Sequence, residues 1–148
     1  MTDAEIDAFL EEPHSAGLVS IGEDGYPHAT AMFYVVRAGL MTFATYARSQ
    51  KVRNLERNPK AAVLVETGHD YSELRGVLIQ GDADLRRAPD LAGDVMIELA
   101  SRYWGFDPET ASDDAIEMIR ERGSKRTVVV INPVRVVSWD HNKLSGGY

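Results

Sequence analysis

Hydrophobic and polar residues alternate along much of this chain with a period of two, the spacing that is typical of β-strands. In the segment 27–37, for example, Phe33 and Val35 share one face, and residues 34 and 36 share the other. Ala38-Gly39 has the form of a tight hairpin turn. The pattern predicts strands at residues 16–21, 27–37, 40–46, 61–66, 75–86, 126–131 and 134–139, with Asn132-Pro133 separating the last two.

Other segments have apolar residues three or four positions apart, which indicates short helices. Thr2-Asp3-Ala4-Glu5 has the form of a capping box at the start of a first helix, which ends before Pro13. Further helices are expected at residues 90–103 and 113–122, the second with Gly123 as its C-cap. Strands at hairpin spacing with few helices between them favour an antiparallel barrel over an alternating parallel sheet. We therefore expect a mainly β protein with minor α content.

Composition narrows the class of protein. A chain of 148 residues with 44% hydrophobic content can build one core and is short for two, so residues 1–148 are expected to form a single domain. The absence of cysteine excludes disulfides, thiolate catalysis and cysteine-ligated metal centres. The chain lacks a run of 18 apolar residues and an apolar leader, so we expect a cytoplasmic protein with no membrane partner. A net charge of −7 argues against nucleic acid as a partner.

One short basic segment stands out against this acidic background. Between Arg48 and Lys60, five cations stand beside one anion. Ser49 is placed as the N-cap of a helix of about two turns, which Asn58-Pro59 ends. The free backbone N–H groups of its first turn, together with Arg48 and Lys51, are suited to binding a phosphate group. The alternative interpretation is a basic surface helix that contacts only solvent.

The basic helix lies in a strand–helix–strand setting that matches a known family. A turn, a strand, a hairpin and another strand precede the helix, and a further strand follows it. The matching stretches are residues 24–27, 43–45, 48–55 and 58–63. This order resembles the split β-barrel flavin and deazaflavin oxidoreductases, the superfamily of pyridoxamine 5′-phosphate oxidase. The last predicted strand, with residues 133–140, is similar to the actinobacterial branch of coenzyme F420-dependent enzymes, and the resemblance covers nearly the whole chain.

The resemblance implies a fold, an assembly and a set of cofactor-binding residues. The fold is a six-stranded antiparallel split β-barrel of the FMN-binding type. The assembly is an obligate homodimer with two cofactors in clefts at its interface, to which Phe33 and Val35 are expected to contribute. The positions carried over are Arg48, Ser49 and Lys51 for the cofactor phosphate, Asn54 for bracing the turn, Thr30, Met32 and Thr45 for the tricyclic ring, and Tyr71 and Arg126 for the cofactor tail.

The function implied is that of an oxidoreductase that transfers hydride from reduced coenzyme F420 to a small, electron-poor organic acceptor. When a cofactor carries the hydride, the protein needs no nucleophile or general base, so we expect no catalytic side chain. We also expect no metal site, because the four histidines are too scattered in the sequence to give ligand spacing.

Two alternatives stay open. The first is an FMN-dependent enzyme similar to pyridoxamine 5′-phosphate oxidase. Such enzymes usually carry an arginine on the second strand, where this chain has Ala29-Thr30-Ala31-Met32. Five cations also exceed what a single phosphate engages, whereas coenzyme F420 has a phosphodiester and a carboxylate-rich glutamyl tail. The second alternative is a non-catalytic protein that binds a cofactor or haem.

Overall fold

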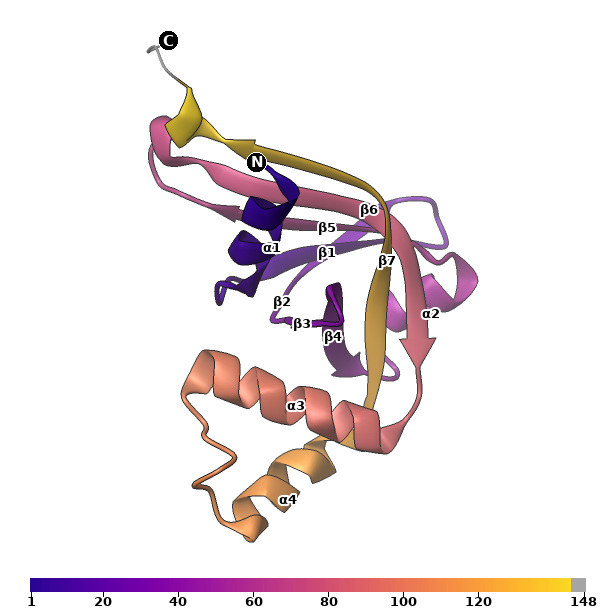
Figure 1. Cartoon of the computed structure of the whole chain (residues 1–148). Helices are drawn as coiled ribbons and strands as arrows, with labels where there is room; N and C mark the ends of the chain where they lie inside the picture. The colour runs from indigo at the N-terminus through magenta and orange to yellow at the C-terminus, as the bar shows by residue number, and fades with distance from the viewer. Residues whose placement is uncertain (145–148) are drawn as a thin grey trace.

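A computed structural model describes residues 1–144, and within them one antiparallel sheet curls into a half-barrel (Figure 1). The sheet has seven strands in the order β2-β1-β5-β6-β7-β4-β3, so the expected count of six is wrong. Most strands pair with hairpin neighbours, as the spacing of the sequence pattern predicted. The strands are β1 Ala16–Ile21, β2 Pro27–Met32, β3 Val35–Arg37, β4 Leu40–Tyr46, β5 Lys60–Thr67, β6 Arg75–Arg86 and β7 Arg126–Asp140.

Four α-helices and two short 3-10 helices complete the part of the chain that the structure describes. In Figure 1, α3 and α4 lie together at one end of the barrel. The predicted capping box at Thr2 and Glu5 is present at the start of α1. Among residues 1–144, no helix is both long and apolar enough to cross a membrane. The helices are α1 Asp3–Glu11, α2 Gln50–Arg57, η1 Tyr71–Glu73, α3 Pro89–Trp104, α4 Asp113–Gly123 and η2 His141–Lys143.

The segment 27–37 forms two strands, where the sequence pattern predicted one. The strand breaks because Tyr34 turns into the core, where it is fully buried and its hydroxyl donates to the carbonyl oxygen of Leu10 at 3.0 Å. Burial raises the pKa of the Tyr34 hydroxyl, so the group stays a neutral donor. Val35 is then buried under α3, while Phe33 stays 44% exposed. The expectation that Phe33 and Val35 form one exposed interface is therefore wrong.

The last two predicted strands are one continuous strand, β7, and Asn132-Pro133 does not separate them. The reason is a bulge on the β6–β7 ladder: Gln80 pairs with Arg135 and Gly81 pairs with Pro133, so the register skips one residue of β7. A side chain at residue 81 would overlap the carbonyl group of residue 132, so glycine is required for this close approach. The bulge bends the ribbon of β6 and β7 and lets it run through the proline.

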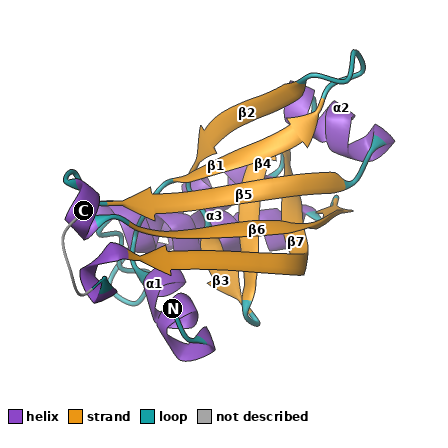
Figure 2. Cartoon of the chain, turned by 90° about the horizontal axis from the view of Figure 1, so that it is seen from above, coloured by secondary structure: helices purple, strands orange, loops and turns teal. Residues whose placement is uncertain are grey.

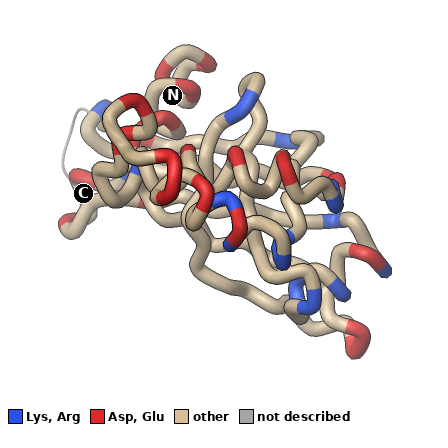
Figure 3. Tube along the Cα trace, turned by 90° about the horizontal axis from the view of Figure 1, so that it is seen from below, with Lys and Arg blue, Asp and Glu red and all other residues tan. Residues whose placement is uncertain are grey.

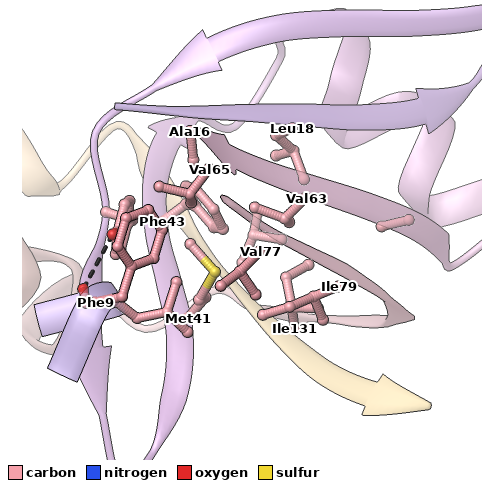
Figure 4. Packing of buried hydrophobic residues seen from close by; sticks show 14 of the residues in the cluster. Phe9, Ala16, Leu18, Met41, Phe43, Val63, Val65, Val77, Ile79 and Ile131 are labelled. Atoms are coloured by element: carbon pink, nitrogen blue, oxygen red, sulfur yellow. Dashed lines mark hydrogen bonds between the residues drawn. The ribbon is translucent and has the colours of Figure 1, made fainter. Parts of the chain in front are cut away.

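Two hydrophobic clusters form the core. The main cluster fills the half-barrel beneath α1, with Phe9, Phe43 and Val63 fully buried (Figure 4). The second cluster holds α3 against β4 and β7. Gly123, which was expected to be the C-cap of α4, is the last residue of that helix, and Ser124 is the C-cap; a side chain at residue 123 would collide with the backbone of Gly93 on α3. Its role is therefore close packing of the two helices.

The turn between β3 and β4 gives a stability prediction. Ala38 and Gly39 both have positive φ, 51° and 76°, as a type I′ turn requires. Alanine is strained there, whereas asparagine tolerates the left-handed region. Ala38→Asn should therefore stabilise the protein by about 0.5–1 kcal/mol, measured by urea unfolding. Gly39→Ala is the matched control and should destabilise it by about 1 kcal/mol; equal effects of both changes would contradict this account of the turn.

Candidate functional site

The basic helix forms where the sequence predicted it, directly after β4. It runs from Gln50 to Arg57 as α2, with Ser49 as the N-cap residue. Val52 and Leu55 are buried against the barrel, so the opposite face of the helix remains available to solvent or to a ligand. The helix ends at Asn58, next to Pro59, as expected.

A buried amide holds α2 on the barrel. The side chain of Asn54 is fully buried and donates to the hydroxyl of Ser20 on β1 at 3.1 Å. Its carbonyl oxygen accepts hydrogen bonds from Gln50 at 2.9 Å and from Arg57 at 3.2 Å. Because buried polar groups are costly to leave unpaired, this network fixes the position of the helix and of its first turn.

Cations from β7, from α2 and from the turn before α2 gather at the start of this helix. The Lys51 ammonium lies 3.4 Å from the hydroxyl of Thr45, at the end of β4. Burial lowers the pKa of Lys51, which means that desolvation disfavours its charge and that a bound anion would offset this cost. Arg126, at the start of β7, lies over the ring of Tyr46 at 4.5 Å from its centroid. Several Lys and Arg positions lie at this end of the molecule, away from both termini (Figure 3).

The β4–β7 register explains why residues that are far apart in sequence meet here. Thr45 pairs with Thr127, and Tyr46 pairs with Arg126. Next to them, Tyr46, Ala47, Arg48 and Lys125 line a recess of 470 Å³. A neighbouring recess of 530 Å³ shares Tyr46 and Lys125 and extends to Arg126 and the last turn of α4. Together the two recesses form a groove that runs from Arg48, just before α2, toward α4; Arg122, Lys125 and Arg126 also line it, together with the acidic Glu121.

Several buried polar atoms around the helix start lack a protein partner. Ser49 is the N-cap residue, but its hydroxyl makes no capping bond, and its oxygen is buried without a hydrogen-bond partner within the described residues. The same holds for the hydroxyl of Thr127 and for Nε of Arg126, at the start of β7. Unpaired buried donors are costly, so their number at one place points to a polar ligand.

The structure brings together five of the nine predicted site residues. These are Thr45, Arg48, Ser49, Lys51 and Arg126, at the end of β4, the start of α2 and the start of β7. Asn54 lies beneath them as a support. The groove also contains Tyr46 and Lys125, which sequence reasoning missed, and Thr127 lies buried beside Thr45. Lys125 could have been found from the sequence, because it is adjacent to Arg126 at the start of a predicted strand.

The other three predicted residues lie elsewhere. Thr30 is on β2, and Met32, at the far end of that strand, packs against the main core. Tyr71 is on η1, beyond the end of β5, and is 58% exposed. Since β5 spans about 23 Å at the usual rise of a strand, η1 and α2 lie at opposite ends of the sheet within this chain.

This donor set fits an organic phosphate. It offers an ammonium, guanidinium groups, hydroxyls and the N–H groups of a helix start, which are the groups that bind phosphate in proteins. Within residues 1–144, no three His, Asp or Glu side chains are placed to hold a metal ion. The groups of this donor set are suited to binding and orienting an anionic cofactor through hydrogen bonds and ion pairs.

Comparison with solved structures shows three informative neighbours. A conserved hypothetical protein from Mycobacterium tuberculosis is 37% identical, with a TM-score of 0.90 over 100% of this chain and 90% of that one. A protein named F420 reductase is 25% identical, with a TM-score of 0.68 over 88% of this chain and 94% of that one. The haem storage protein of Vibrio cholerae, 15% identical with a TM-score of 0.67 over 93% of each chain, shares the fold.

A search of curated protein sequences finds no match to this chain. Residues 2–140, however, match the sequence family described as pyridoxamine 5′-phosphate oxidase. That match spans nearly the whole chain and agrees with the split-barrel architecture and with the resemblance seen in the sequence. This chain belongs to the pyridoxamine 5′-phosphate oxidase family.

Proposed function

We propose that this protein is an oxidoreductase that binds coenzyme F420 and passes hydride to a small, electron-poor organic acceptor. The observation that carries the proposal is the extent of the cationic groove. Ser49, Lys51 and the first turn of α2 are enough for one phosphate group, yet Arg48, Lys125 and Arg126 continue beyond them. A phosphodiester followed by a carboxylate-rich tail can pair with these additional cations, whereas a single terminal phosphate cannot reach all of them.

Each part of the site has a separate task in this proposal. Lys51 and Ser49 hold the phosphate, and Arg126 with Lys125 and Arg48 holds the tail. The hydroxyl of Thr45 is available to orient the ring, and the buried Asn54 keeps the helix start in place. The chemistry that coenzyme F420 supplies when bound is two-electron hydride transfer. The protein positions the reacting groups and excludes water from them.

An FMN-dependent activity is the second candidate, because the family is named for an FMN enzyme. The sequence of β2 argues against an FMN enzyme, because Pro27–Met32 contains no arginine that could help to bind a terminal phosphate. The similarity to a protein named F420 reductase, at 25% identity, favours the deazaflavin. The haem storage protein shares the fold at 15% identity, so it adds no argument for haem binding.

We also propose that the protein forms a homodimer through the outer face of the sheet. Leu64, Leu78 and Val137 lie opposite one another on β5, β6 and β7 and form an apolar row on that face. Leu64 is 40% and Val137 is 38% exposed. Figure 2 shows this face with none of the described helices over β1 and β5. A two-fold pairing of this face can lay η1 of one copy beside α2 of the other, which is how Tyr71 would reach a cofactor tail.

The first prediction tests the phosphate contact. Lys51→Ala should weaken F420 binding roughly 10- to 150-fold, because it removes a charge-assisted contact from a partly buried site. Arg53→Ala is the matched control. This substitution also removes one positive charge from α2, but the side chain of Arg53 is exposed on another face of the helix. Fluorescence titration measures both. Equal losses would show that only bulk charge matters and that the site is misplaced.

The second prediction separates the two cofactors. The protein should bind F420 at least about tenfold more tightly than FMN at moderate salt, and added salt should weaken F420 more steeply, because its charge is spread along the exposed groove. Titration of both cofactors at two ionic strengths measures this. Tighter FMN binding, or equal salt dependence, would favour the FMN enzyme instead.

The third prediction concerns assembly. Light scattering at micromolar concentration should give twice the chain mass of 16.4 kDa. Leu64→Glu should produce monomers by placing charge in the apolar row. Met118→Glu, at a residue that is 55% exposed on α4, should leave the dimer intact. A monomeric wild-type protein, or dissociation by both changes, would contradict an interface on this face.

A further inference from the structure

A second cavity, of 300 Å³, lies at the seam where the half-barrel opens, next to α1. The seam exists because the β4–β7 ladder runs only from Tyr46 and Arg126 to Thr42 and Val130. Beyond that point β4 begins from the hairpin turn, while β7 follows β6 around the bulge. The two strands diverge, and α1 covers the gap between them.

The floor of this cavity is apolar and belongs to the main core. Met41, Ile79 and Ile131 line it and are 3%, 7% and 1% exposed. Figure 4 shows these three side chains close together inside the half-barrel. Val36 and Leu40, from the β3–β4 hairpin, form a partly buried wall. A ligand that fills this space needs an apolar body, because its surroundings offer few polar side chains.

The rim of the cavity is acidic. Asp7 and Glu11 lie one turn apart on α1, both exposed, and both line the opening. Glu11 contacts the guanidinium of Arg102 at 3.4 Å, whereas Asp7 has no hydrogen bond or ion pair within residues 1–144. The lining contains no lysine or arginine. Because Arg102 already pairs with Glu11, Asp7 is the carboxylate that is left to receive a cation at the opening.

We propose that this cavity is a second ligand site, which takes a small organic cation with an apolar body, such as an alkyl- or arylalkylammonium. The apolar group would occupy the floor beside Ile79 and Ile131, and the ammonium would lie beside Asp7 at the rim. Charge complementarity selects this class over alcohols and carboxylates of the same shape. The cavity shares no lining residue with the anion groove, so the two sites bind ligands of opposite charge at separate places.

The test uses three probes with one apolar body and different heads: 4-phenylbutylammonium, 4-phenylbutanol and 4-phenylbutyrate. Each is titrated into the full-length protein while the methyl resonances of Ile79 and Ile131 are followed by NMR. The ammonium should bind about 2- to 5-fold more tightly than the alcohol, because its head group pairs with an exposed carboxylate. The carboxylate should bind most weakly. Val36→Phe, which narrows the cavity, should weaken all three probes.

Matched variants identify the carboxylate responsible. Asp7→Asn should remove the advantage of the ammonium over the alcohol, while Asp3→Asn should preserve it, because Asp3 is on the same helix and does not line the cavity. The proposal is wrong if none of the probes gives a saturable shift of these methyl groups. It is also wrong if the ammonium and the alcohol bind equally, or if Asp3→Asn and Asp7→Asn act alike, which would indicate long-range charge alone.

Discussion

The bulge on the β6–β7 ladder is the constraint on which the rest of the structure depends. These two strands pair along the whole length of β6, and they serve both the barrel and the extended part of the sheet. A straight ribbon cannot do both, because β7 must leave β4 after Val130 and still follow β6. Gly81 opposite Pro133 provides the bend, which brings the start of β7 to α2 and leaves the apolar seam under α1.

Local sequence patterns predicted most of the fold because most of the strands have one buried face. The bounds of β1, β4 and β6 agree with the alternation residue for residue. The misses share a cause. Tyr34 fits the alternation of a long strand, but its hydroxyl bond to Leu10 and the contact of its backbone N–H with Tyr103 break that strand. Pro133 and Gly123 likewise depend on neighbours from other strands and helices, which a local pattern cannot contain.

The candidate site was predictable to the extent that it is contiguous in sequence. Arg48, Ser49 and Lys51 stand together on the chain, and the helix that carries them follows from ordinary start and stop signals. Lys125 reaches the same place only because β4 pairs with the start of β7, nearly 80 residues later. Tyr71 was assigned to the site by the resemblance alone, and within this chain it lies at the other end of the sheet from α2.

The continuity of β7 limits how this chain can change during evolution. One strand supplies Arg126 to the groove, Ile131 and Pro133 to the seam cavity, and Val137 to the outer face of the sheet. Because side chains alternate along a strand, inserting or deleting one residue before the bulge would exchange inward and outward positions on that side of it. Such changes would disturb several surfaces at once. Length variation among relatives is therefore expected to accumulate in the loop 105–112, between α3 and α4, and to spare β7.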